Sequence, residues 1–491
     1  MNYITSENVL MIGSVLLFVG ILAGKTGYRF GIPVLLLFLF VGMLFGSDGL
    51  GLHFSNMESA QFIGMVALTI ILFSGGMDTK FSDVRPVIAP GAVLSTLVVL
   101  LTTVFTGLFV WWLSGMAWSN IHFACASSLL LAATMSSTDS ASVFATLRSQ
   151  RMNLKHNLRP LLELESGSND PMAYMLTLVL IQFATAAPDA GGTDWAHIAG
   201  LFAVQFAVGA AVGFAIGHFA VWSLNRLNID NASLYPILLL SVAFFTFSAT
   251  GLLHGNGYLA VYITGMIIGN NRIPYRKEVA TFMDGLTWLF QIIMFLMLGL
   301  LVNPHEMLHV ACVALLIGLF MILVARPASV FLSLLPFRRI NLRSRLFISW
   351  VGLRGAAPII FAIYPVVAGV EGSDLIFNIV FFITLLSLLT QGTTLAASAR
   401  LLGLSTPLEK TGNEFGVELP EEIDSDLRDM TVTRRMLEKA DTLKDMNLPA
   451  GTLVMLIKRD DEFLIPNGSL RLHEGDKLLL ISEGKKSEEG S

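Results

Sequence analysis

The sequence predicts an all-α polytopic membrane protein with 13 transmembrane helices, inverted repeats and two interrupted helices, followed by a small α/β cytoplasmic domain. Composition is the first observation: 54% of the 491 residues are hydrophobic and only 14% are charged, whereas soluble domains carry about 25% charged residues. The second is the distribution of charge, because 12 of the 31 Lys and Arg residues fall at or after Ser405. We therefore expect a membrane domain over residues 1–404 and a cytoplasmic domain over residues 405–491.

Long apolar runs fill the first 404 residues, and each is close to the roughly 20 helical residues that cross a bilayer. We place the spans at 8–24, 31–47, 60–77, 87–114, 119–147, 160–186, 195–224, 232–252, 257–271, 279–302, 307–336, 345–369 and 374–402. The two cysteines, Cys125 and Cys312, both lie inside apolar runs, so no disulfide framework is expected.

The loops between these spans alternate in charge. Lys and Arg residues occupy the loops near residues 25–29, 80–85, 148–159, 226, 272–277 and 338–345, and the other loops have none. Basic loops remain on the cytoplasmic side of a membrane. The pattern predicts a multi-pass protein of the bacterial inner (plasma) membrane, with the N-terminus outside and the C-terminal domain in the cytoplasm.

The fifth span contains a run of small hydroxyl residues around an acid. Residues 134–140 read Thr-Met-Ser-Ser-Thr-Asp-Ser, which suits an interrupted helix whose free backbone groups line a cavity. Asp139 lies nine residues before Arg148, so it is about 13 Å inside the membrane at 1.5 Å per residue. Charged groups at such depth usually mark ion or proton pathways.

The sixth span carries a second deep carboxylate. Ser166, Asn169 and Asp170 are spaced i, i+3 and i+4, which places them on one helix face. Asp170 lies eleven residues from Arg159 and is therefore about 16 Å deep. Pro171 has no backbone N–H to donate, so we expect the helix to open locally beside this carboxylate.

The twelfth span predicts a second interrupted helix. Gly352-Leu353-Arg354-Gly355 precedes Pro358 by a few residues, and Arg354 is nine residues past Arg345, about 13 Å deep. A buried Arg needs a carboxylate partner, and we expect Glu165 or Glu163, with Glu165 forming a structural ion pair. Spans five and twelve are equivalent in an inverted repeat of spans 1–6 and 8–13, an arrangement typical of secondary transporters.

These three motifs, in this order, resemble those of NhaP-type monovalent cation/proton antiporters, and the resemblance covers residues 8–403. The motifs are Thr138-Asp139, then Glu165-Ser166 with Asn169-Asp170, then Gly352-Leu353-Arg354-Gly355. The resemblance implies that Asp170 binds the monovalent cation and the proton in turn. It implies that Thr138, Asp139 and Ser166 supply or support ligands, that Asn169 ties the interrupted helix to the site, and that Glu165 pairs with Arg354.

The resemblance also implies a dimerisation domain, a six-helix core that moves, and hence a homodimer. One position departs from the family pattern. Many members have an acid in the third span before a Gly-Gly pair, whereas this chain has Ser74 before Gly75-Gly76. An accessory acidic function is therefore not expected at Ser74.

The tail resembles an RCK-C (TrkA-C) domain. The similar stretches are residues 443–451, 457–460, 465–468 and 475–481. The tail has no Gly-x-Gly-x-x-Gly, so no Rossmann nucleotide site is expected. The combination resembles the cell volume regulation protein A branch, which implies potassium/proton exchange and a small regulatory ligand on the tail.

We therefore expect a secondary antiporter that exchanges a monovalent cation, with potassium favoured, for a proton, with sodium as the alternative cation. One exchanging carboxylate predicts electroneutral 1:1 exchange, for ion, pH and volume homeostasis. A gated cation channel with an RCK-type regulator would need a Thr-Val-Gly-Tyr-Gly-like filter, and the sequence has no such run. A membrane-embedded hydrolase is not expected, since no nucleophile–His pair occurs at matching depth. We expect no enzymatic activity, no cofactor and no nucleic acid.

Overall fold

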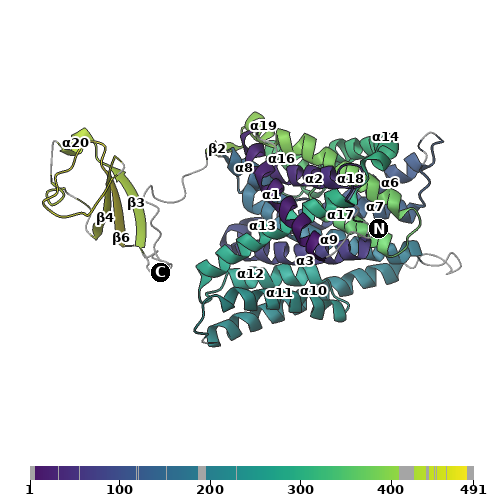
Figure 1. Cartoon of the computed structure of the whole chain (residues 1–491), viewed down its shortest axis with the longest axis horizontal. Helices are drawn as coiled ribbons and strands as arrows, with labels where there is room; N and C mark the ends of the chain where they lie inside the picture. Colours follow the sequence, from purple (N-terminus) through teal and green to yellow (C-terminus); the bar gives the residue numbers. More distant parts are fainter. Residues whose placement is uncertain are drawn as a thin grey trace. The chain divides into compact units, whose positions relative to one another are not determined.

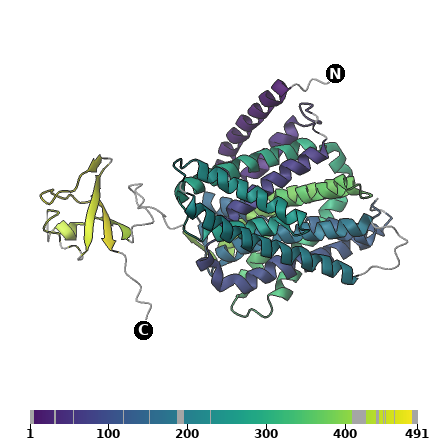
Figure 2. The ribbon, with the colours of Figure 1, turned by 90° about the horizontal axis from the view of Figure 1, so that it is seen from below.

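The computed structural model describes residues 6–30, 33–52, 54, 56–117, 119, 121–150, 152–185, 195–227, 229–407, 425–437, 442–446, 448, 451–460 and 462–483. The chain divides into two compact units, Met1–Pro407 and Leu408–Ser491. The first unit is a bundle of packed helices, and the second is built around a β-sheet (Figures 1 and 2).

The helices of the first unit follow the apolar runs of the sequence. They are α1 (Ser6–Phe30), α2 (Val34–Phe45), α3 (Met57–Asp78), α4 (Phe81–Val84), α5 (Ile88–Val93), α6 (Val99–Ser114), α7 (Cys125–Thr134), α8 (Ser140–Ser149), α9 (Leu158–Thr185), α10 (Trp195–Arg226), α11 (Leu234–Leu252), α12 (Gly257–Gly269), α13 (Arg276–Leu301), α14 (Pro304–Phe320), α15 (Arg326–Ser333), α16 (Leu342–Trp350), α17 (Ala356–Val367), α18 (Ser373–Ser387) and α19 (Thr393–Leu401). Single 3₁₀ or π-helical turns join α4 to α5, α5 to α6, α14 to α15 and α18 to α19.

Length and composition support a membrane-spanning fold. Among the described residues, 7 continuous helical segments are long and apolar enough to cross a bilayer, and several shorter apolar helices accompany them. The exact number of 13 spans stays a prediction. One boundary differs clearly, because α1 continues past Lys25 to Phe30 where a loop is predicted. A helix need not end at the membrane edge, since a Lys side chain can extend its charged group to water.

Both predicted interruptions are present. Residues 135–139 separate α7 from α8, and residues 351–355 separate α16 from α17. The two extended segments touch, since the Asp139 backbone amide donates a hydrogen bond of 2.8 Å to the Leu353 carbonyl. The two interrupted helices therefore meet at the depth where the sequence predicts buried charges.

Helix α9 remains continuous through Pro171 and ends only at Thr185. The predicted local opening is therefore confined to the one hydrogen bond that proline cannot make. The Pro171 carbonyl accepts a hydrogen bond of 2.7 Å from the Asn256 side chain at the start of α12. Helix α9 packs against α7, α12 and α17, which places its middle turns in the centre of the unit.

Helices α3 and α13 form the opposite wall of the site. They pack against each other, and α12 and α2 flank them. Backbone contact is close between α3 and α12, because a side chain at Gly265 would overlap the Phe73 carbonyl. Close approach of this kind is why small residues are favoured where membrane helices meet.

A short antiparallel ribbon ends the first unit. Strand β1 (Met152–Leu154) pairs with β2 (Ser405–Pro407), and the Lys155 amide donates a hydrogen bond of 2.9 Å to the Leu404 carbonyl. Strand β1 lies in the connection between α8 and α9, and β2 is the last element before the second unit. The chain that leads to the tail is thus hydrogen-bonded to the loop between the two acid-bearing helices.

The second unit contains a four-stranded antiparallel sheet of order β3-β6-β4-β5. Its elements are β3 (Ser425–Thr431), α20 (Arg434–Leu437), β4 (Thr452–Arg459), β5 (Glu462–Leu464) and β6 (Lys477–Glu483). Val432, Ile457 and Leu478 are buried at its core, and Arg459 pairs with the buried Asp476 at 2.7 Å. Of the predicted tail motif, Asn447, Pro449 and Ala450 lie outside the described residues.

Candidate functional site

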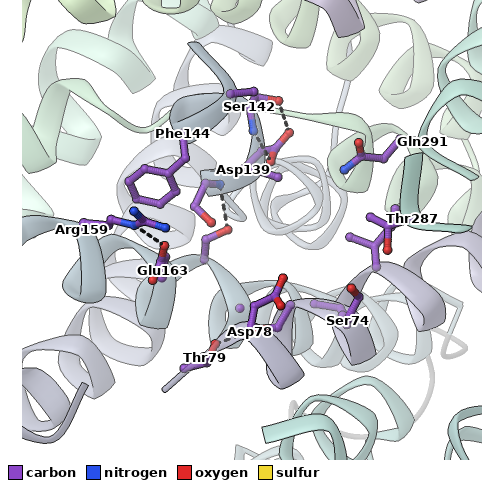
Figure 3. Close-up of a pocket in the computed structure, with 18 of the residues that line it drawn as sticks. Ser74, Asp78, Thr79, Asp139, Ser142, Phe144, Arg159, Glu163, Thr287 and Gln291 are labelled. Atoms are coloured by element: carbon purple, nitrogen blue, oxygen red, sulfur yellow. Dashed lines mark hydrogen bonds and ion pairs between the residues drawn. The ribbon is translucent and has the colours of Figure 1, made fainter. Parts of the chain in front are cut away.

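A cavity of about 810 Å³ enters the first unit (Figure 3). Its lining begins at the exposed Lys80 and Arg148 and reaches Asp139 and Asp170 inside the bundle. The mouth therefore lies on the side whose basic loops are predicted to be cytoplasmic. A second cavity of about 40 Å³ shares Asp139 and Asp170 with the first and is bounded by both interrupted helices.

Asp139 is the N-cap residue of α8. Its carboxylate accepts a hydrogen bond of 3.1 Å from the Ser142 amide and one of 2.5 Å from the Ser142 hydroxyl. The positive end of a helix stabilises a negative charge placed at its N-terminus. Gly355 packs directly on this carboxylate, because any side chain at Gly355 would overlap it. Asp139 is therefore fixed in position by α8 and by the second interrupted helix.

Ser166 and Asn169 connect α9 to the first interrupted segment. The Ser166 hydroxyl donates to the Thr138 carbonyl at 2.8 Å and accepts from the Ser140 amide at 2.9 Å. The Asn169 amide donates to the Thr138 hydroxyl at 2.6 Å. The two Ser166 hydrogen bonds satisfy backbone groups that the interruption leaves without helical partners, and the Asn169 hydrogen bond holds the Thr138 side chain.

Asp170 follows on the same helix and keeps one uncommitted oxygen. Its Oδ1 atom is buried, yet it accepts no hydrogen bond from any residue that the structure describes. Asp170 and Asp139 line both cavities. The structure thus brings together all five residues for which the sequence predicts a role in binding, namely Asp170, Asp139, Thr138, Ser166 and Asn169.

Arg354 supports the interrupted segments by hydrogen bonds to backbone oxygen. Its guanidinium donates to the Ser136 carbonyl at 2.9 Å and also to the Ser137 carbonyl. Its own backbone amide donates to the Ser387 hydroxyl at 3.0 Å. Only 1% of Arg354 is exposed, so this side chain is an internal brace of the site.

The predicted ion pair between Glu165 and Arg354 is wrong, because Glu165 pairs with a different arginine. Glu165 Oε1 instead accepts from Arg326 Nη2 at 2.7 Å, and both side chains are almost fully buried, with 1% and 3% exposure. The guanidinium of Arg354 is occupied by the two carbonyls at the end of α7. The distance along the sequence could not distinguish the two arginines, because both lie deep in the bundle and the pairing depends on how the helices are arranged in space.

Sequence reasoning missed Arg326, although a signal was available. Arg326 is a single charge within an apolar run, 12 residues before Arg338, and is too deep to reach a loop. It begins α15 directly after a π-helical turn. Gly352 gives it space, since a side chain at Gly352 would overlap the guanidinium. The two glycines of the Gly352–Gly355 motif therefore accommodate one buried charge each.

An aromatic layer lies one helical turn beyond Asp170 on α9. Tyr174 makes edge-on contacts with Tyr258 at 4.7 Å and with Tyr364 at 5.3 Å between ring centroids, and Phe361 packs against both Tyr174 and Tyr258. Tyr258 is completely buried. None of these rings lines the two cavities around Asp170, so the layer separates the site from the other end of the bundle.

Uncharged polar residues on α3 and α13 also line the large cavity. They are Ser74, Thr287 and Gln291, and Figure 3 shows them apart from Asp139, across the cavity. Asp78 lies one turn from Ser74 on the same helix and lines the cavity as well. Sequence reasoning did not select Thr287 or Gln291, because single uncharged polar residues are common in apolar helices.

Two family descriptions match the chain. Residues 13–400 match "Sodium/hydrogen exchanger, transmembrane", and residues 441–488 match "TrkA-C domain". The protein called K(+)/H(+) antiporter NhaP2 of Shewanella baltica (strain OS223) is 37% identical over 480 residues, covering 97% of this chain and 81% of that protein. The K(+)/H(+) antiporter NhaP of Alkalimonas amylolytica is 42% identical over 402 residues, covering 82% and 68%.

A solved structure shares the fold. The sodium proton antiporter MjNhaP1 of Methanocaldococcus jannaschii matches 81% of this chain and 100% of its own chain, with a TM-score of 0.66 and 22% identity. At this identity the likeness concerns the fold alone. The predicted helical membrane fold with a small C-terminal sheet domain is confirmed.

Proposed function

Because the chain belongs to the sodium/hydrogen exchanger family, we propose that it exchanges a monovalent cation for a proton at Asp170, with potassium as the favoured cation. The observation that carries this proposal is the uncommitted, buried Asp170 oxygen at the inner end of an 810 Å³ cavity. A dehydrated cation and a proton both need the carboxylate oxygens of Asp170, so the site holds one or the other. Competition of this kind couples the two fluxes.

The arrangement of Asp139 supports a 1:1, electroneutral exchange. Its carboxylate accepts hydrogen bonds from the Ser142 amide and hydroxyl at the N-terminus of α8, and such donors favour the anionic form against the cost of burial. Asp139 then remains charged through the cycle, and Asp170 alone alternates between cation and proton. The relatives that share 37% and 42% identity are named K(+)/H(+) antiporters, which supports potassium over sodium.

The experiment is an Asp170→Asn variant assayed in everted membrane vesicles. Cation-induced dequenching of a pH-sensitive dye should disappear with both potassium and sodium, while the protein remains inserted at the wild-type level. Asp374→Asn is the matched control, because Asp374 is exposed in the first turn of α18 and lines neither cavity. Exchange by the Asp170 variant at more than half the wild-type rate refutes the proposal.

We also propose where the protein works and how it assembles. It is an inner-membrane homodimer, with the N-terminus outside and the tail in the cytoplasm, and it serves ion, pH and volume homeostasis. The large cavity then faces the cytoplasm, and the aromatic layer of Tyr174, Tyr258 and Tyr364 closes the outer side. Movement of the helices that carry Asp139 and Asp170 would expose Asp170 to each side in turn.

We also propose that the tail regulates exchange, through a small ligand that it binds. Strand β2 supports this role, because it precedes the tail directly and pairs with β1 between α8 and α9. Two truncations separate the tail from the ribbon. A chain that ends at Pro407 keeps β2 and should exchange with an altered pH set-point, whereas one that ends at Leu404 should show a further change. Equal set-points for both truncated chains would remove the ribbon from the proposal.

A further inference from the structure

Helices α3 and α13 present a polar stripe to the large cavity. On α13, Asp284, Thr287 and Gln291 are spaced i, i+3 and i+7, which places them on one helix face. On α3, Asp78 and Ser74 are one turn apart. All five line the cavity that ends at Asp170, and α3 and α13 are packed neighbours. The stripe runs from the mouth of the cavity to its inner end.

Gln291 ends this stripe at the inner part of the cavity. Only 8% of the residue is exposed, and its amide points into the cavity (Figure 3). This amide forms no hydrogen bond within the described part of the chain. It is therefore free to bind water or an ion that occupies the cavity.

The smaller cavity shows what that ligand contacts. Gln291 lines the 40 Å³ space together with Ser137, Thr138, Asp139 and Asp170. Its remaining lining on the α3 and α13 side is apolar, formed by Leu68, Ile71, Met294 and Phe295. A water molecule needs about 10–15 Å³ of such space, so there is room for a dehydrated monovalent cation with one or two waters. Gln291 is the polar group that α13 contributes to this space, which Asp170 also lines.

We propose that Gln291 is a specificity-determining residue whose amide oxygen coordinates the transported cation opposite Asp170. The inference rests on the proposed exchange at Asp170 and adds a ligand from a helix other than α7, α8 or α9. Neutral oxygens have a weaker field than carboxylates, and sites rich in neutral oxygens suit potassium better than the strongly hydrated sodium ion. Ser74 and Thr287 provide hydroxyl groups along the approach. One carboxylate plus neutral ligands thus favours potassium.

The test compares Gln291→Leu with Gln182→Leu in everted vesicles. Gln182 is the matched control, because it is exposed on α9 and lines neither cavity. Gln291→Leu should raise the KM for potassium about tenfold and the KM for sodium much less, with maximal rates within about twofold of wild type. Gln182→Leu should leave all four constants unchanged. A structural defect would instead lower the maximal rate without changing the potassium-to-sodium ratio of KM values.

Gln291→Glu is the second variant and keeps an oxygen ligand of the same length. It should retain a KM for potassium within about threefold of wild type at alkaline pH, even if Gln291→Leu fails to insert. Unchanged KM ratios in Gln291→Leu, or a loss of potassium affinity in Gln291→Glu as large as tenfold, would overturn the assignment. Failure of the underlying exchange is distinguished by Asp170→Asn, which tests transport of both cations without reference to Gln291.

Discussion

Replacing Arg326 with Met should destabilise the membrane unit strongly. The substitution removes the partner of Glu165 while Glu165 itself stays buried, with 1% of its side chain exposed. An uncompensated buried charge costs about 3–5 kcal/mol. The variant also loses the hydrogen bond of 3.3 Å that Arg326 donates to the Ile348 carbonyl.

Two further variants show how much of the lost stability comes from leaving a charge buried and unpaired. Arg159→Met breaks the Arg159–Glu163 pair on the same helix α9, whose side chains are 45% and 30% exposed, and exposed pairs contribute about 0–1 kcal/mol. The double variant Arg326→Met/Glu165→Leu removes both buried charges, and such replacements are often neutral or stabilising. We therefore expect a large loss in the first variant, a small one in the second, and recovery in the third.

Thermal unfolding in detergent measures the three effects. For a unit of this size, 1 kcal/mol corresponds to about 2 °C or less in Tm, so Arg326→Met should lower the midpoint by roughly 5 °C. A midpoint that falls no further than that of Arg159→Met would refute the buried pair. So would a double variant that is less stable than Arg326→Met, because the loss would then come from packing rather than charge.

Gly355→Ala should slow exchange at least about tenfold, because the added methyl group would displace the Asp139 carboxylate. Gly285→Ala should leave the exchange rate unchanged, because a methyl group there meets no atom within 4 Å. Dye dequenching measures both variants, and equal exchange rates would contradict the packing of Gly355 on Asp139. A membrane potential imposed on proteoliposomes should leave the exchange rate unchanged, and clear acceleration would show that Asp139 also exchanges a proton. Burial alone would raise the pKa of Asp476, but hydrogen bonds from Arg459 and the His473 amide hold that pKa below its usual 3.8. The ionised Asp476 carboxylate therefore stabilises the tail fully above pH 3.8, and this stabilisation is lost as the pH falls below that value. Hydrogen-exchange protection factors of β6 at pH 5 and pH 3, each corrected for the intrinsic exchange rate at that pH, test this sign, and Asp476→Asn should abolish the difference.

The positions of the deep charges could be predicted from the sequence. Asp139, Asp170 and Arg354 interrupt long apolar runs, and counting residues from the nearest basic loop gave similar depths for all three. Their depth along each helix is a local property, so it does not require knowledge of packing. The interruptions were also visible, because hydroxyl residues and glycines replace the usual apolar ones at 134–140 and 352–355.

Contacts between helices could not be predicted in the same way. Two buried arginines were available to Glu165, and only the tertiary packing, which brings the Arg326 side chain of α15 to Glu165 of α9, determines the partner. Gln291 gave no signal, since its significance depends on lining the same cavity as Asp170 from another helix. The β1–β2 ribbon was missed because three-residue strands are too short to show a period of two.

The contact between the two interrupted helices has a consequence for how this site can change over evolutionary time. The Asp139 amide binds the Leu353 carbonyl, and Arg354 binds the carbonyls of Ser136 and Ser137. Each extended segment therefore holds the other in its conformation through these hydrogen bonds. An isolated substitution in 136–139 or 352–355 disturbs both, so the two segments are expected to vary together. A graft that transfers one segment to a relative without the other would bring mismatched halves together.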